Sequence, residues 1–191
     1  MRRVLSLLLI ASALISLNAC AKPTGEASPA AEFRAALVNA DGCSFRAEVT
    51  ADFGDTVQSF TLDCAADADG KTELTVVSPE SIAGITATVA DAAGTITYDG
   101  MAMDFGLLAD GQVAPAAAPA LAVECWLRAY ISSSGREEEL YRVTYENGYD
   151  EKTLTVDTWF ENGLPISAEV CYNQQRILRL VLTDFAFRRS G

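Results

Sequence analysis

The sequence of 191 residues contains no histidine. Histidine is the usual general acid or base near neutral pH and the commonest zinc ligand, so its absence excludes histidine-based triads and weakens any enzyme interpretation. Basic residues are also scarce: 14 Lys and Arg stand against 26 Asp and Glu, and the formal net charge is −12. Such acidity argues against binding to nucleic acid or adsorption onto anionic headgroups.

Recognisable catalytic and metal-binding motifs are missing as well. The chain has no glycine-rich phosphate loop, no nucleophile elbow and no pair of carboxylates at a familiar spacing. The stretch Asp67-Ala68-Asp69-Gly70 begins like a calcium loop but lacks the later oxygen ligands and the Glu at the twelfth position, which favours a hairpin turn. We therefore expect no metal site, no catalytic residues and no enzymatic activity.

Long apolar runs are absent except at the N-terminus. Arg2 and Arg3 precede an almost wholly apolar stretch from Val4 to Leu17, too short to cross a membrane comfortably, which takes ~20 residues. A basic start, a short apolar run and small residues at its end are typical of a secretory signal peptide.

The residues that close this run, Leu17-Asn18-Ala19-Cys20, are similar to a bacterial lipobox. We predict a signal peptide at 1–19, a diacylglycerol attached to Cys20, a tether at 20–28 and a single domain at 29–191. We expect no cofactor other than this covalently attached diacylglycerol. The predicted location is extracytoplasmic, on the outer face of the cell membrane. The alternative is an ordinary signal peptide in which the cysteine is incidental.

The remaining chain predicts an α+β, β-rich fold: an antiparallel sheet of roughly ten strands that curls, with an N-terminal helix and a mid-chain apolar helix. Apolar and polar residues alternate over Cys43 to Phe53 and from Phe60 to Cys64, as in strands with one buried face. A two-residue turn at Phe53-Gly54 would place Cys43 opposite Cys64. Further strands are expected at 72–77, 85–89, 95–98, 101–105, 140–145, 153–160, 166–172 and 176–187.

Two helices are predicted. Ser28 and Pro29 suit the N-cap and first position of a short amphipathic helix, with Phe33, Ala36, Leu37 and Ala40 on one face. Residues 120–131 form a second helix that is apolar on nearly every side, with only Glu124 and Arg128 charged, so it should be covered on most sides. Ser132 to Gly135 would end it.

The stretches Thr75 to Ile85 (TVVSPESIAGI) and Thr97 to Met101 (TYDGM), with the lipobox and the order of strands and helices, resemble the LolA/LolB-like family of lipoprotein-carrier half-barrels. By this resemblance, which covers Ala30 to Phe187, the chain is similar to small anchored lipoproteins of Gram-positive bacteria. It implies a curved antiparallel half-barrel with the mid-chain apolar helix on its concave face, and an apolar surface on that face that receives acyl chains. The family's soluble carriers lack an anchor.

Four cysteines remain after lipidation, at spacings that match no zinc motif. A Cys43–Cys64 disulfide is possible outside the cytoplasm, and two buried free thiols are the alternative. Trp126, Phe45, Phe60, Leu62 and Ala122 are candidates to line a ligand cavity, although such residues equally fill a closed core.

Two functions are consistent with these features. The first is a membrane-tethered module that binds or transfers a lipid or other apolar ligand. The second is a non-catalytic scaffold that docks an envelope protein, for example one acting in sporulation or germination.

Overall fold

The computed structural model describes residues 28–52, 56–90, 93–106, 108–109, 112–147 and 154–189. The predicted signal peptide, Cys20 and most of the tether lie outside these residues. None of the helices in the described ranges is long and apolar enough to cross a membrane.

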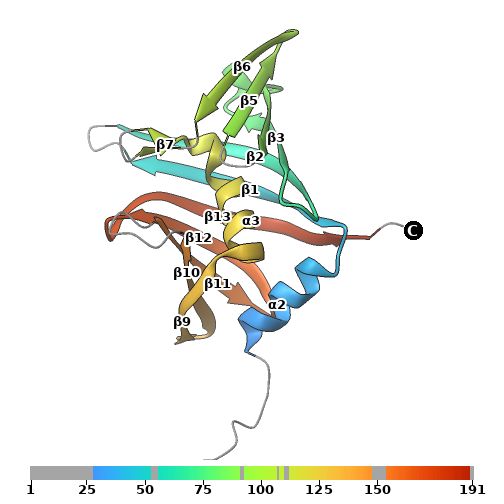
Figure 1. Cartoon of the computed structure of the whole chain (residues 1–191). Helices are drawn as coiled ribbons and strands as arrows, with labels where there is room; N and C mark the ends of the chain where they lie inside the picture. Colours follow the sequence, from blue (N-terminus) through green and yellow to red (C-terminus); the bar gives the residue numbers. More distant parts are fainter. Residues whose placement is uncertain are drawn as a thin grey trace, which may run out of the picture.

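Eleven antiparallel strands form one sheet in the order β6-β5-β4-β3-β2-β1-β13-β12-β11-β10-β9. The end strands β6 and β9 are not neighbours, so the sheet is curved but unclosed around helix α3 (Figure 1). This confirms the predicted half-barrel. The strands are β1 Gly42–Asp52, β2 Val57–Asp67, β3 Thr72–Ser78, β4 Thr86–Ala90, β5 Ala93–Tyr98, β6 Met101–Gly106, β9 Tyr130–Glu137, β10 Leu140–Asn147, β11 Leu154–Glu161, β12 Leu164–Tyr172 and β13 Gln175–Arg188. A separate two-stranded ladder pairs β7 Leu108–Ala109 with β8 Gln112–Val113.

The two predicted helices are present. Helix α2 spans Pro29–Val38, and the Ser28 side chain accepts a hydrogen bond from the backbone N–H of Ala31. Phe33 and Leu37 are buried against the sheet as predicted, but Ala36 is exposed. Helix α3 spans Ala118–Arg128 and lies on the concave face. Short 3₁₀ turns occur at Glu80–Ile82 (η2) and Pro115–Ala117 (η3).

The predicted C-terminal end of the second helix is wrong. The helix ends at Arg128, and β9 begins at Tyr130 and continues through the serines to Glu137. The prediction extended the helix because residues 129–131 are apolar and continue its pattern. In the structure, the backbone of Tyr130 and Ile131 instead pairs with β10. A β-ladder formed by distant residues thus overrides the local preference of a short stretch.

The predicted pairing of β1 with β2 is also wrong by two residues. Cys43 lies opposite Ala66, and Cys64 lies opposite Phe45. The ladder closes at Asp52 and Val57, so the connection is longer than the assumed two-residue turn. The assumed turn, Phe53-Gly54, lies outside the described residues. A shift of two keeps the same side chains on the same face, which explains why the predicted core face is nevertheless correct.

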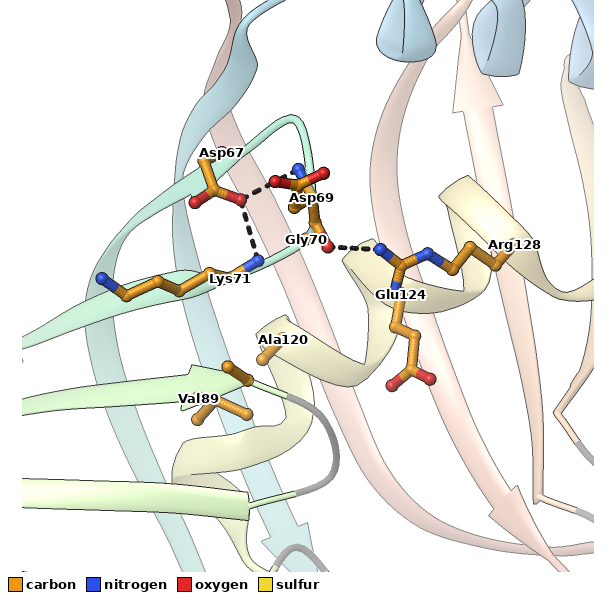
Figure 2. Close-up of a pocket in the computed structure, with 9 residues that line it drawn as sticks. Asp67, Asp69, Gly70, Lys71, Val89, Ala120, Glu124 and Arg128 are labelled. Carbon is orange, nitrogen blue, oxygen red and sulfur yellow. Dashed lines mark hydrogen bonds between the residues drawn. The ribbon is translucent and has the colours of Figure 1, made fainter.

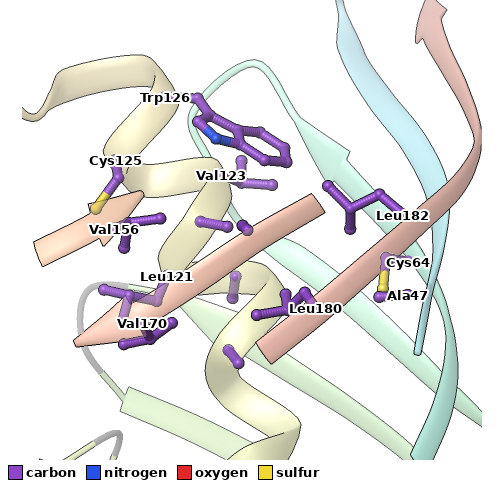
Figure 3. Close-up of a cluster of buried hydrophobic side chains, with 14 of the residues drawn as sticks. Ala47, Cys64, Leu121, Val123, Cys125, Trp126, Val156, Val170, Leu180 and Leu182 are labelled. Carbon is purple, nitrogen blue, oxygen red and sulfur yellow. The ribbon is translucent and has the colours of Figure 1, made fainter. Parts of the chain in front are cut away.

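The core lies between α3, α2 and the concave face of the sheet. Figure 3 shows the part of it between α3 and the sheet. Cys43, Phe45, Ala47 and Val49 of β1 are all buried. Gly42 at the start of this strand has φ +136°, and a Cβ there would lie 2.0 Å from the carbonyl oxygen of Ala66. Only glycine therefore allows β1 and β2 to approach this closely at their ends.

Candidate functional site: the concave face and its uncovered end

The residues predicted to line a cavity lie mainly in the core. Trp126, Ala122, Leu62 and Phe45 are buried, and Phe60 is half-buried. The Trp126 ring meets the rings of Phe33 and Phe45 edge-on, with centroids 5.7 and 5.8 Å apart. Its indole N–H donates a 2.9 Å hydrogen bond to the hydroxyl of Thr158. These contacts fill the space between the middle of the sheet and the C-terminal half of α3.

Helix α2 holds the end of α3 in place. The Arg34 guanidinium donates hydrogen bonds to the backbone carbonyls of Trp126, Cys125 and Ala129 at 2.7, 3.2 and 2.7 Å. It also lies over the ring of Tyr145, 5.5 Å from its centroid. Carbonyls in the last turn of a helix lack partners within the helix, and a cation is favourable there. The position of α3 on the sheet is thus set by a polar contact as well as by packing.

Cys43 and Cys64 lie diagonally across β1 and β2, and all four cysteines in the described part of the chain are free thiols. Burial raises the pKa of the Cys43 thiol to about 12 and that of the Cys64 thiol further still. Both groups are therefore protonated and unreactive at neutral pH.

A cavity of about 360 Å³ lies at another side of α3 (Figure 2). Its walls come from the β2–β3 turn, the end of β4 and one face of the helix. The lining residues are Asp67, Asp69, Gly70, Lys71, Val89, Ala90, Ala120, Glu124 and Arg128. The five residues predicted from the sequence do not line it.

Much of the polar wall is fixed by hydrogen bonds. One carboxylate oxygen of Asp67 accepts the backbone N–H groups of Asp69 and Lys71, both at 3.0 Å. Arg128 donates to the backbone carbonyl of Asp69 at 2.5 Å, which joins the β2–β3 turn to α3 (Figure 2). The stretch Asp67 to Gly70 is thus a hairpin turn. Among the described residues no cluster of His, Cys, Asp or Glu is arranged to hold a metal ion.

Beyond α3 the concave face continues onto β4, β5 and β6. The register places Gly94, Ile96 and Tyr98 of β5 on one face with their partners Phe105, Met103 and Met101 of β6. The neighbouring β4–β5 ladder pairs Gly94 with the buried Val89 of β4, so this is the face that contains the core. The Phe105 ring lies directly over Gly94, where a Cβ would be 2.3 Å from it.

Three large apolar side chains at the far end of this face are uncovered. Tyr98, Met101 and Met103 are 54, 69 and 65% exposed, and the β5–β6 hairpin projects past α3 (Figure 1). The opposite face of the hairpin is polar: the Thr95 hydroxyl donates a 2.8 Å hydrogen bond to Asp104. The hairpin is therefore amphipathic, with its apolar side on the concave face of the half-barrel.

Sequence reasoning named Tyr98 among the aromatic residues that could line a lipid cavity, but it missed the exposed Met101 and Met103 and the cavity beside α3. The strands carrying Tyr98, Met101 and Met103 were identified, but a strand's alternation does not reveal whether a helix covers its apolar face. Asp69 and Arg128 are 59 positions apart, and no local pattern joins them.

No protein-family model matches the chain, and no curated protein is significantly similar to it. Solved structures similar to this chain include members of the family that it resembles in sequence. A LolA superfamily protein from Nitrosomonas europaea has a TM-score of 0.46 and 10% identity, over 86% of this chain and 96% of the other. A putative outer membrane lipoprotein-sorting protein domain from Vibrio parahaemolyticus has a TM-score of 0.48 and 10% identity, over 85% and 92%. The lipoprotein LppX from Mycobacterium tuberculosis has a TM-score of 0.38 and 7% identity, over 84% and 96%.

Proposed function

We propose that this protein is a membrane-anchored, extracytoplasmic, non-catalytic module that binds an acyl chain of a lipid on the concave face of β4–β6. The observation that carries the proposal is the uncovered apolar end of that face. Large apolar groups gathered on one side of a projecting hairpin cost free energy in water, and such patches typically mark binding sites. Methionine is unbranched and flexible, and suits a surface that adapts to an apolar ligand.

The dimensions of this face fit one acyl chain. A strand advances about 3.3 Å per residue, so Gly94 to Tyr98 spans about 13 Å. A bilayer's hydrocarbon core is ~30 Å thick for two leaflets, which makes one chain about 15 Å long. A single chain laid along this face, over the Phe105 ring that covers Gly94, would therefore extend from the cavity beside α3 to the exposed methionines.

Saturable binding of a fluorescent fatty acid to the delipidated full-length protein tests the proposal. Substituting Met103→Asp places a carboxylate on the proposed site and should weaken binding at least about tenfold, because burial of a methionine side chain stabilises by ~1.5–3 kcal/mol. Val181 on β13 is 41% exposed and lies between the buried Leu180 and Leu182, so its side chain points to the convex face. Val181→Asp is the matched control and should change affinity less than twofold. Absence of saturable binding, or equal losses in both variants, would overturn the proposal.

A second candidate function is docking of an envelope protein along β6. This strand ends the sheet, so its outer edge offers backbone groups to an added strand. Crosslinking from a reagent placed on β6 tests this function in membranes. Stoichiometric recovery of one protein, in a chain that binds no lipid, would favour this function over the first.

A further inference from the structure

We propose that the cavity between α3 and the β2–β3 turn receives the headgroup of the bound lipid, and that it selects a headgroup that donates hydrogen bonds and carries no net negative charge. This rests on the proposed function, because the acyl chain on β4–β6 would bring the headgroup to the cavity. Val89 belongs to both places: it lines the cavity and lies on the concave face opposite Gly94.

The wall of the cavity has an apolar part and a charged part, which suits an amphipathic molecule. Val89, Ala90 and Ala120 form an apolar part, and the charged residues form the rest. Its volume of about 360 Å³ is at the lower end of the range for small-molecule sites. A headgroup would find polar partners there while its chain leaves along the sheet.

The charges of the wall decide which headgroup fits. The lining has three carboxylates, on Asp67, Asp69 and Glu124, against two cations, on Lys71 and Arg128. Both cations already have partners: Arg128 donates to the Asp69 carbonyl, and the Lys71 ammonium lies 3.7 Å from the Glu73 carboxylate. The acceptors that remain for a ligand are carboxylate oxygens, which attract ammonium and hydroxyl groups and repel a phosphate without a compensating cation.

The net charge of the whole chain, −12, adds to the same preference. Carboxylates near a partly enclosed cavity interact with a ligand charge through a lower effective dielectric than water provides. A phosphatidylethanolamine headgroup satisfies both conditions, and a phosphatidylglycerol headgroup fails the charge condition.

Competition against the bound fluorescent fatty acid by short-chain phosphatidylethanolamine and phosphatidylglycerol with identical acyl chains tests the inference. The full-length protein should prefer the ethanolamine lipid about tenfold at low ionic strength, and the preference should shrink in 0.5 M salt because the charges are partly exposed. Glu124→Lys changes the wall from a net negative to a net positive charge and should reverse the preference. Glu32→Lys, on the exposed side of α2, makes the same charge change far from the cavity in sequence and should leave the preference intact.

The possible failures are distinguishable. If both lipids compete equally and Glu124→Lys changes nothing, the headgroup assignment is overturned while acyl-chain binding stands. If Glu32→Lys reverses the preference as strongly as Glu124→Lys, the preference reflects overall charge and the cavity assignment is overturned. If the fluorescent fatty acid itself does not bind, the proposed function fails first. A thermal melt of each variant confirms that it is folded before the lipids are compared.

Discussion

At the scale of single residues, Thr158 shows how one buried polar group fixes the aromatic core. Its hydroxyl is fully buried and accepts the indole N–H of Trp126 at 2.9 Å. The indole has a large apolar surface with a single donor, and a buried donor without a partner is costly. The alternation of β11 predicts that Thr158 faces inward, but its partner lies 32 positions away on a helix.

Replacing Thr158 by valine keeps the shape of the side chain and removes the acceptor. We expect Thr158→Val to lower the free energy of unfolding by about 1–3 kcal/mol, because the indole N–H stays buried without a partner. Thr97→Val is the control, since Thr97 is exposed on the polar face of β5, and surface changes of this kind stay within ~0.5 kcal/mol. Urea unfolding followed by tryptophan fluorescence measures both; equal midpoints would contradict the prediction.

The buried thiols predict how stability depends on pH. Burial disfavours the thiolate and raises the pKa of Cys43 from the usual 9.0 to about 12. Above pH 9 the unfolded chain releases this proton and the folded chain keeps it, so stability falls as the pH rises from 9 towards 12. We expect the urea midpoint to fall between pH 8 and pH 10.5, and to fall less in Cys43→Ala.

The same variant bears on the possible Cys43–Cys64 disulfide, which stays a prediction from the sequence. A disulfide would remove both titrating thiols, so a wild-type midpoint that falls no more between these pH values than that of Cys43→Ala would contradict the free-thiol interpretation. Intact mass before and after reduction would then show a change of two protons for the bridge.

At the scale of the elements, the arrangement of α2 and α3 depends on Arg34. Packing positions the apolar faces of both helices, and the Arg34 guanidinium in addition donates hydrogen bonds to three carbonyls at the end of α3. The sequence predicts both helices and the N-cap of α2, because caps and apolar periodicity are local signals. It does not predict the Arg34 contact, because that depends on how two helices far apart in the chain meet.

We expect Arg34→Met to destabilise the fold by about 2–3 kcal/mol, since methionine keeps an apolar stem and removes the three hydrogen bonds to these carbonyls. Arg34→Lys should fall between methionine and the wild type, because an ammonium cannot match the geometry of the planar guanidinium. Arg46→Met is the control: it breaks an ion pair with Asp63 whose two side chains are about half exposed, and such pairs stabilise little. If the unfolding midpoint of Arg34→Met is no lower than that of Arg46→Met, the hydrogen bonds of Arg34 to the end of α3 do not stabilise the fold.

At the scale of the whole molecule, the sequence predicts the architecture better than the site. Alternation, turn residues and one all-round apolar helix predicted a curling antiparallel sheet and a covered helix, and the family resemblance added the open half-barrel. The β1–β2 register and the start of β9 were missed because each depends on a loop length or a distant partner strand. The cavity and the uncovered hairpin were missed because they result from how far α3 extends over the sheet, which no residue pattern encodes.

The membrane anchor is the last prediction, and it determines where the concave face would meet lipid. Each methylene buried in the bilayer contributes ~0.8 kcal/mol to the free energy of membrane binding. Two acyl chains therefore anchor a protein stably, whereas a single myristoyl chain binds only marginally. We therefore expect the full-length protein to sediment with membranes and to enter the detergent phase on phase separation, with the mass of a diacylglycerol on Cys20. Cys20→Ser should appear in the soluble fraction. Cys171→Ser, which alters a partly exposed thiol in the domain, should stay with the membranes. If the Cys20→Ser protein sediments like the wild type, the acyl anchor is not what holds this protein at the membrane.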